Sequence, residues 1–200
     1  MTKPPYAAVL SGPGFSIGIQ CNDDEITEIT YLEPQPEVVP KTPLAQEAVR
    51  QLRAWLKDPA FEFGLPLAPA GTHFQRRVWQ QIAAIPPGRT MSYGEVAAAI
   101  RSGPRAVGNA CGANPYPIVV PCHRVVAANQ GLGGFGGKTA RPPAPSPREG
   151  VTAVRFAPGE QGSGLGRPGA GTRGGFLLDI KRWLLEHERQ SPRPPFRERE

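Results

Sequence analysis

Two helix-start signals of the same form follow each other in the middle of the chain. Thr72 and Gln75 have the T-x-x-Q spacing of a capping box, and Ser92 and Glu95 have the equivalent S-x-x-E spacing. In this motif each side chain of the pair satisfies a backbone donor at the start of a helix. Apolar residues recur at helical spacing after the first box, and Pro104 suits the first position of a third helix. Two short helices after a longer one are typical of a helix-turn-helix, although plain three-helix packing fits the same pattern.

The second helix of this pair, residues 105–112, consists almost entirely of small residues. A helix that reads base edges in the major groove normally carries long polar side chains, whereas here Arg105 is the only long cationic one. Small side chains favour binding to DNA shape and backbone instead. The net charge of +6 and the pI near 9.6 favour nucleic acid over a membrane surface, because no basic amphipathic helix stands out. A basic surface without a particular partner is the alternative.

The first third of the chain has a different pattern. Short apolar and polar alternations between residues 6 and 32, separated by turn residues, predict a small antiparallel meander. Cys21 falls at the end of its second strand, where a structural thiol is expected. After a proline-punctuated linker, apolar residues at helical spacing over 44–56 predict one amphipathic helix, with Thr42 as its N-cap. Trp55 on this helix is expected to lie in the core.

Beyond the third helix the pattern is less regular. An apolar run at 117–120 is expected to form a strand that carries the chain to Cys122, and a Gly-rich loop follows at 131–137. From 139 to 175 the composition is dominated by Pro, Gly, Ala and Arg without sustained periodicity, which predicts a disordered insertion. Helical spacing returns over 178–188.

These segments predict an α/β N-terminal unit at residues 1–70, built from a small antiparallel sheet plus a helix. We expect a mainly α, winged-helix-like DNA-binding and active-site domain at 71–188, with the insertion at about 139–175, and a disordered tail at 189–200. The three cysteines are odd in number and irregularly spaced, which favours free thiols in a reducing compartment. With neither a signal-peptide pattern nor an apolar membrane span in the sequence, we expect a soluble, cytoplasmic protein.

Cys122 and His123 are adjacent, and this pair carries the candidate chemistry. The thiolate rather than the thiol attacks, so a nucleophilic cysteine needs a base, and that base needs an orienting acid. Glu188 on the last predicted helix has no obvious local partner and is a candidate for that acid. A buried structural Cys-His pair fits the same residues. A metal site is less favoured, because no second Cys or His stands at a ligand spacing from Cys122.

The segment Pro121-Cys122-His123-Arg124-Val125 resembles the active-site signature of the O6-alkylguanine-DNA alkyltransferases, also called methylated-DNA-protein-cysteine methyltransferases. The resemblance extends, in order, through most of the second unit. The matching segments are Thr72-x-Phe74-Gln75, Val78-Trp79, Ile85-Pro86-x-Gly88, Ser92-Tyr93-Gly94, Arg105-Ala106-Val107-Gly108, Asn114-Pro115 and Lys181-x-Trp183-Leu184-Leu185-x-His187-Glu188.

The resemblance implies a role for each matched residue at the reaction centre. Cys122 would accept the alkyl group, His123 would deprotonate its thiol through a water, and Glu188 would orient His123. Asn114 would link the helix-turn-helix to the site. Tyr93 would donate a proton to the ring of the leaving guanine.

The resemblance also implies contacts to DNA and to the damaged base. Arg105 would fill the gap left in the duplex when the nucleotide is flipped out. Its helix would contact DNA through further small residues, namely Ala106, Gly108, Asn109 and Ala110. The positions that correspond to the pocket of the flipped base are Pro117, Val125, Phe135 and Gly136.

The implied function is direct-reversal DNA repair. The alkyl group of O6-methylguanine, and of O4-methylthymine, in double-stranded DNA would be transferred irreversibly and stoichiometrically to Cys122 by a monomer without cofactor or metal. A non-enzymatic alkyltransferase-like lesion binder is an alternative, but such relatives replace the acceptor cysteine. A cysteine hydrolase would leave the helix-turn-helix unexplained, and a purely regulatory DNA-binding role lacks base-reading side chains.

This sequence departs from the family pattern in two places that bear on the implied residue roles. The insertion separates the Gly-rich loop from the last helix, and we expect it to loop out and leave Glu188 in place. Some relatives bind zinc in the first unit, but Cys21 and His73 alone do not make a site. His73 and His187 are expected to be surface or packing residues.

Overall fold

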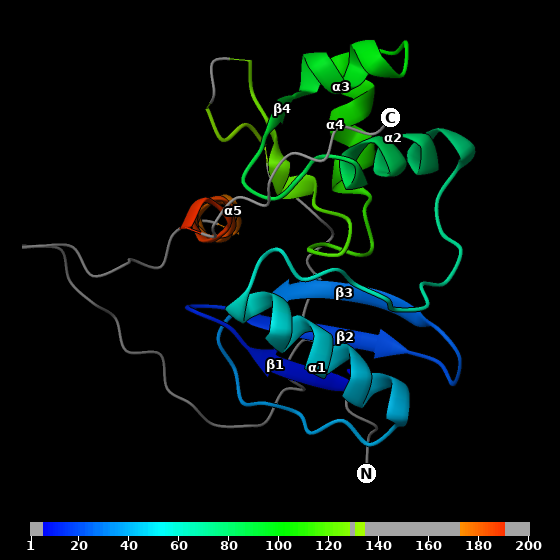
Figure 1. The fold of residues 1–200 in the computed structure, drawn as a ribbon, viewed down its shortest axis with the longest axis vertical. Coiled ribbons are helices and arrows are strands. Elements are labelled where there is room, and N and C mark those ends of the chain that lie inside the picture. The colour runs from blue at the N-terminus through cyan, green and yellow to red at the C-terminus, as the bar shows by residue number, and fades with distance from the viewer. Residues whose placement is uncertain (1–5, 129–130, 135–172, 191–200) are drawn as a thin grey trace, which may run out of the picture.

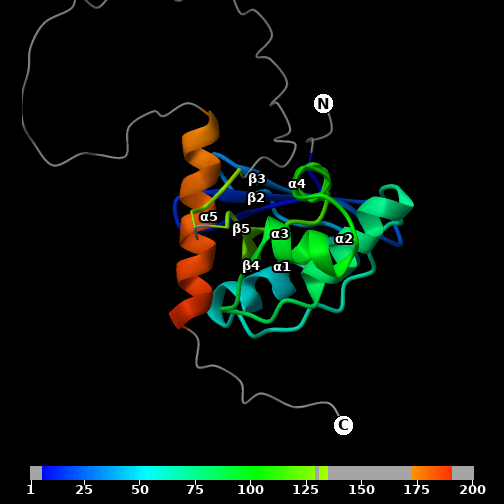
Figure 2. The ribbon, with the colours of Figure 1, turned by 90° about the horizontal axis from the view of Figure 1, so that it is seen from above.

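The computed structural model describes residues 6–128, 131–134 and 173–190. Figure 1 shows a three-stranded sheet covered on one side by helix α1, with the helices of the C-terminal half packed beyond it. Helix α5 (Arg173–Gln190) runs along one side of the molecule, beside both the sheet and the C-terminal elements, as the second view shows (Figure 2). No helix in the described part of the chain is long and apolar enough to cross a membrane.

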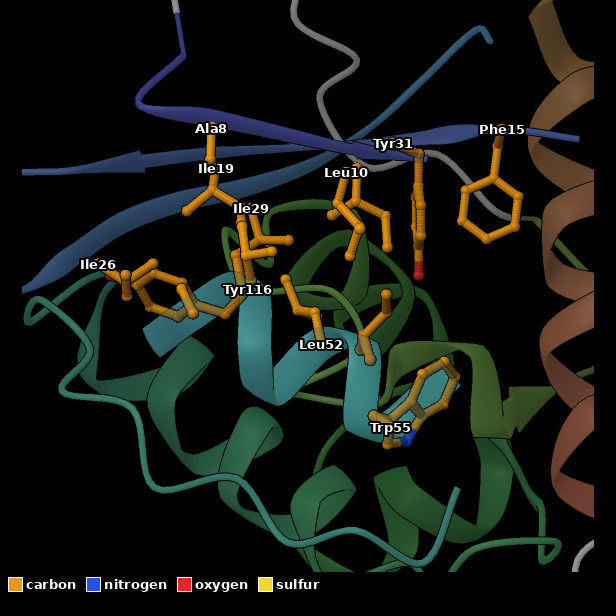
Figure 3. Packing of buried hydrophobic residues seen from close by; sticks show 14 of the residues in the cluster. Ala8, Leu10, Phe15, Ile19, Ile26, Ile29, Tyr31, Leu52, Trp55 and Tyr116 are labelled. Carbon is orange, nitrogen blue, oxygen red and sulfur yellow. The ribbon is translucent and has the colours of Figure 1, made fainter. Parts of the chain in front are cut away.

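The N-terminal unit is the predicted antiparallel sheet plus one helix, so this part of the fold class is confirmed. Strands β1 (Ala8–Ser11), β2 (Ser16–Cys21) and β3 (Ile26–Leu32) pair in sequence order. Helix α1 (Pro43–Lys57) begins where Thr42 Oγ1 accepts a hydrogen bond from the backbone N–H of Ala45 at 3.3 Å. Figure 3 shows Trp55 and Leu52 of α1 facing the apolar side chains of the sheet.

The C-terminal unit contains both predicted capping boxes. Helix α2 (His73–Ala83) and helix α3 (Tyr93–Ala99) each start with reciprocal side-chain and backbone bonds, at 3.2 and 2.8 Å for Thr72 and Gln75 and at 3.1 and 2.6 Å for Ser92 and Glu95. Helix α4 (Pro104–Gly112) has Pro104 in its first turn, as predicted. The second helix of the helix-turn-helix therefore runs from Pro104 to Gly112, one residue earlier at its start than the predicted 105–112.

A small parallel sheet attaches the helix-turn-helix to the segment that contains Cys122. Strand β4 (Met91–Ser92) pairs with β5 (Val125–Val126), which follows directly on the 3₁₀ turn η1 (Cys122–Arg124). The indole N–H of Trp79 on α2 donates to the carbonyl of Ala110 on α4 at 2.8 Å. The capping, pairing and buried hydrogen bonds together hold α2, α3 and α4 against the turn that carries the cysteine.

The prediction of a strand at 117–120 is wrong. Residues 117–120 form a turn, closed by a 2.7 Å bond from the N–H of Val120 to the carbonyl of Tyr116, and Ile118 has φ 75. The run is apolar because Ile118 inserts into the core of the N-terminal unit, where it is 2% exposed. Burial between the two units and strand pairing produce the same apolar pattern in sequence, and Pro117 lacks a ladder donor.

Helix α5 is longer than predicted, because it begins at Arg173 and ends at Gln190. Its first residues have two glycines and no apolar period, so local propensity does not reveal the helical turn that precedes Leu177. The predicted insertion is therefore wrong for residues 173–175, and its remainder lies outside the described residues. Of the predicted tail, 191–200 also lies outside them, whereas Arg189 and Gln190 belong to α5.

Candidate active site

Cys122 lies at the start of η1, where the C-terminal unit meets the N-terminal unit. Its residue is 8% exposed, and its backbone N–H donates to the carbonyl of Val120 at 2.8 Å. The buried side chain of Asn114 closes the preceding turn: Nδ2 donates to Val120 at 2.8 Å, and Oδ1 accepts from the N–H of Tyr116 at 2.9 Å. The Asn114 side chain also acts to lower the pKa of the Cys122 thiol. One amide therefore connects the end of α4 to the candidate nucleophile.

The structure brings His123 and Glu188 together across 65 residues of sequence. His123 Nε2 lies 2.7 Å from Glu188 Oε1, and both side chains are fully buried. Because Nε2 faces a carboxylate, it carries the proton, and Nδ1 is left as the basic nitrogen. Nδ1 is buried and has no hydrogen-bond partner among the described residues. The histidine thus presents one acceptor atom to the interior of the site.

Arg124 is a buried member of the site to which the sequence analysis assigned no role. Its Nε donates to both carboxylate oxygens of Glu188, at 3.1 and 3.0 Å, and Nη2 donates to Oε1 at 2.8 Å. Its Nη1 donates to the backbone carbonyl of Ile85, and the N–H of Gly88 donates to Glu188 Oε2 at 3.1 Å. An arginine inside a run that is otherwise buried is a signal that an acid lies elsewhere in the fold.

The charges of this cluster leave His123 neutral. Burial raises the pKa of Glu188, but the hydrogen bonds and charges of His123 and Arg124 outweigh it and lower the pKa to about 2. Since Arg124 already neutralises the carboxylate, burial dominates at His123 and lowers its pKa, although Glu188 acts in the other direction. A neutral imidazole with a free lone pair on Nδ1 can accept a proton near pH 7.

The Cys122 thiol rests protonated. Burial raises its pKa, and the Asn114 side chain together with the ammonium of Lys181 offsets part of that rise. The buried Cys111 thiol on α4 has its pKa raised to about 12 by burial and by the charge of Cys122. A thiol of this kind requires a base at the moment of reaction, and His123 is the adjacent one.

Lys181 is a second buried cation that the sequence analysis left without a role. Its Nζ donates to the carbonyls of Val125, at 2.7 Å, and Leu132, and it lies 5.9 Å from the centre of the Tyr93 ring. Burial lowers the pKa of Lys181 to about 8, although the charge of Cys122 acts against this. Its place four residues after Leu177, on the apolar face of α5, is the sequence signal that could have identified it.

Tyr93 stands on the other side of the site. Its hydroxyl donates to the carbonyl of Gly134 at 2.8 Å, and burial, followed by the charges of Cys111 and Cys122, raises its pKa to about 12. It is therefore a protonated donor over the whole neutral range. Gly133 has φ 65, and a Cβ there would lie 2.9 Å from the Tyr93 ring, so the loop approaches this ring closely.

The other predicted residues are distributed as follows. On α4, Arg105 and Asn109 are exposed, Ala106 and Gly108 are partly buried, and Ala110 faces the helix core at 1% exposure. Pro117 and Val125 are buried beside the site, whereas Phe135 and Gly136 lie outside the described residues. His73 is exposed, and His187 stacks on Trp183 with ring centres 4.7 Å apart. No group of three or more metal-binding side chains occurs within residues 6–128, 131–134 and 173–190.

Fold and site together define a helix-turn-helix protein with a buried cysteine next to a buried histidine–glutamate pair. Residues 73–151 match the family profile described as the DNA-binding domain of 6-O-methylguanine DNA methyltransferase. The methylated-DNA–protein-cysteine methyltransferase of Mycobacterium leprae is 38% identical over 139 residues, which cover 68% of this chain and 82% of the relative. The chain belongs to the methylated-DNA–protein-cysteine methyltransferase family.

Solved structures extend the similarity to both units. The O6-methylguanine methyltransferase of Mycobacterium tuberculosis aligns with a TM-score of 0.64 at 30% identity, covering 94% of each chain. The structure of the same organism's protein in complex with DNA aligns with a TM-score of 0.62 at 30% identity, covering 92% of this chain and 93% of that one. The predicted fold class, a small α/β unit followed by a mainly helical domain, is therefore confirmed.

Proposed function

We propose that this protein repairs DNA by moving the methyl group of O6-methylguanine in a duplex onto Cys122. The observation that carries the proposal is the buried contact of His123 with Glu188, at 2.7 Å, next to Cys122 and behind the small-residue helix α4. Family membership supports the substrate, because the name of the family states transfer from methylated DNA to a protein cysteine. The M. tuberculosis complex supports DNA as the partner.

The residues of the site account for each proton in the transfer. His123 Nδ1 takes the thiol proton of Cys122 through a bridging water, and Glu188 holds the imidazole and stabilises the imidazolium that forms. The thiolate attacks the methyl carbon in line, so that a sulfur–carbon bond forms as the carbon–O6 bond breaks. Tyr93 donates its proton to the guanine ring, which leaves as the neutral base, and the proton held by His123 then returns through water to the Tyr93 phenolate, so that both residues regain their starting forms. The thioether is stable, so one protein repairs one lesion.

The helix-turn-helix is assigned the task of exposing the base. O6 of guanine lies inside the stacked duplex, and extrusion of a nucleotide costs a few kcal/mol. The small side chains of α4 allow close approach in the minor groove, and the exposed guanidinium of Arg105 fills the gap that the base leaves. Asn114 then links the end of α4 to the turn before Cys122. We extend the proposal to O4-methylthymine, because its methyl group is also bonded to an exocyclic oxygen of the base and can be attacked in the same way.

The direct test is to incubate the protein with a duplex that contains O6-methylguanine and to map the product by peptide mass spectrometry. One methyl per protein, located on Cys122, is expected, and a duplex with O4-methylthymine should give the same adduct. Turnover beyond one equivalent would contradict the proposal. So would methylation at Cys21 or Cys111 with Cys122 unmodified.

Arg105→Ala is expected to slow transfer in a duplex by about tenfold, the factor that corresponds to losing about 1.4 kcal/mol of the compensation for base extrusion. In single-stranded DNA, where the base is already unpaired, the rate should change little. Single-turnover rates on the two substrates provide the measurement.

Arg101→Gly is the matched control for Arg105→Ala. Arg101 is an exposed cation in the turn between α3 and α4, and its φ of 52 suits glycine. Removal of its charge should weaken binding to both substrates by the same factor, because the charge attracts DNA phosphates in duplex and single strand alike. Equal losses on both substrates for Arg105→Ala would contradict a role in base extrusion.

A further inference from the structure

A tight turn between the end of α2 and β4 approaches the candidate active site. The N–H of Arg89 donates to the carbonyl of Pro86 at 3.1 Å, and Gly88 has φ 70. With Pro87 at its second position and a glycine of positive φ at its third, the segment has the features of a type II β-turn. The shape of this turn therefore follows from its local sequence.

The backbone of the turn contacts Glu188 at two points. The N–H of Gly88 donates to Glu188 Oε2 at 3.1 Å. A Cβ at position 88 would lie 3.0 Å from the backbone carbonyl oxygen of Glu188, which is tighter than an ordinary van der Waals contact. Side chains also disfavour the left-handed backbone region that Gly88 occupies. Position 88 therefore requires glycine both for the turn and for the close approach of α5.

The N–H of Gly88 restrains the orientation of the Glu188 carboxylate. Oε1 lies 2.7 Å from His123 Nε2, whereas Oε2 accepts from Gly88 and, at 3.0 Å, from Arg124 Nε. The terminal torsion of a glutamate side chain is broad, so donors on both oxygens restrain the carboxylate better than donors on one. Arg124 reaches the carboxylate through a long side chain, whereas the N–H of Gly88 belongs to the backbone of a tight turn. The turn therefore supplies the more rigid donor.

We propose that Gly88 is a positioning residue of the methyl-transfer site. Its N–H holds Oε2 of Glu188, so that Oε1 stays on His123 Nε2 and Nδ1 remains the basic nitrogen. The inference rests on the proposed function for its role in repair. Because Gly88 follows α2 directly in the chain, the same carboxylate joins the DNA-binding helices to the base of the reaction.

The first test replaces Gly88 with glycolic acid in the full-length protein, which exchanges the N–H for an ester oxygen and adds no side chain. The single-turnover rate of methyl transfer from a duplex with O6-methylguanine should fall about tenfold, because a charged acceptor loses one donor. Glycolic acid in place of Gly14 is the matched control, since Gly14 also has positive φ, at 80, and lies between β1 and β2. This control should transfer methyl at the wild-type rate.

A second readout requires no DNA. The ¹⁵N chemical shifts of the His123 ring at neutral pH should show the proton on Nε2 in the wild-type protein and a mixture of the two tautomers when the N–H of Gly88 is absent. A merely structural role would lower the melting temperature and leave these shifts unchanged. Unchanged shifts would therefore overturn the proposal.

Gly88→Ala tests the packing of the turn against α5. The added Cβ forces a displacement of a few tenths of an ångström at the Glu188 carbonyl, and transfer should fall about fivefold, since a misplacement of about 1 Å can cost about 10²-fold. Gly14→Ala introduces similar backbone strain with no atom within 4 Å of its Cβ, and should leave transfer per folded protein unchanged. If Gly88→Ala did not fold, Gly88→Asn would replace it, because asparagine tolerates positive φ and makes the same Cβ contact.

The outcomes separate this proposal from the proposed function. If the wild-type protein transferred no methyl but loss of the Gly88 N–H changed the tautomer of His123, the proposed function would fail and the positioning role would stand. If the wild-type protein transferred methyl and glycolic acid at position 88 changed neither the rate nor the His123 shifts, the role of Gly88 would be overturned and the proposed function would stand. Equal transfer by the alanine variants at positions 88 and 14 would also overturn it.

Discussion

Cys122→Ala is expected to abolish methyl transfer from O6-methylguanine while duplex binding stays close to that of the wild-type protein. The variant removes the sulfur that forms the new bond, and no other described thiol lies beside His123 in the 3₁₀ turn. The DNA-binding side chains assigned to α4 are untouched. Removal of one buried sulfur should cost about 1 kcal/mol of folding stability. Single-turnover transfer and fluorescence anisotropy with a labelled duplex provide the two measurements.

Cys21→Ala and Cys111→Ala serve as controls for this loss. Cys21 is partly buried at the edge of the N-terminal sheet, 3.9 Å from the Thr42 hydroxyl, and should leave transfer unchanged. Cys111 is buried in α4 and tests whether a neighbouring thiol matters. Residual transfer by Cys122→Ala would contradict the assignment of the acceptor. If Cys122→Ala failed to fold, Cys122→Ser would separate a structural role from a chemical one.

Glu188→Gln is expected to produce the second-largest effect, on both activity and stability. The variant keeps the shape of the side chain but leaves the guanidinium of Arg124 buried without a counter-ion, which costs about 3–5 kcal/mol. Transfer should fall by about 10²-fold, because His123 loses the carboxylate that holds its tautomer and stabilises its charged form. Urea unfolding and single-turnover rates measure the two losses.

The stability difference between wild type and Glu188→Gln should depend on pH in a direction set by the pKa of Glu188. The pKa of Glu188 is lowered to about 2 in the folded protein, below the value of about 4.3 for an unperturbed glutamate. Its stabilising contribution is therefore fully present above about pH 4.3 and is lost as the pH falls through about 2. The stability difference between wild type and Glu188→Gln should shrink over that range. A difference that stayed constant from pH 5 to acid would contradict the ionised pair.

Two companion variants separate charge from chemistry. Glu186→Gln removes an exposed carboxylate from the same helix and should change neither stability nor transfer noticeably. Adding Arg124→Met to Glu188→Gln removes the uncompensated cation, so part of the stability should return while transfer stays low. Recovery of transfer together with stability would mean that Glu188 acts only as a structural counter-ion.

The elements that could be predicted from sequence are those defined by neighbours a few residues apart. Both capping boxes, the N-cap at Thr42 and the antiparallel meander were predicted and are present. The apolar run before Cys122 was assigned to the wrong element, because burial between two units and strand pairing select the same residue types. The first turn of α5 was missed because Gly174 and Gly175 carry no helical signal.

The part of the candidate site that lies within one continuous motif could be predicted from sequence. Contacts between residues from distant segments could not. The adjacency of Cys122 and His123 is local, and the resemblance extended it to Glu188. Nothing local shows that Arg124 neutralises Glu188 and thereby leaves His123 neutral, since their contact spans 64 residues. The position of Lys181 on the apolar face of α5 indicates burial, but only the placement of α5 against β5 shows that its ammonium donates to the carbonyl of Val125.

The sequence by itself determined the helix starts, the small-residue helix with a single long cation, and a cysteine next to a histidine. These properties follow from short-range hydrogen bonding and side-chain size, which do not depend on the rest of the fold. Only the tertiary structure decided which nitrogen of His123 is basic and which cation compensates Glu188. Those properties depend on burial and on charges brought together from distant segments, because a low-dielectric interior strengthens interactions that water would screen.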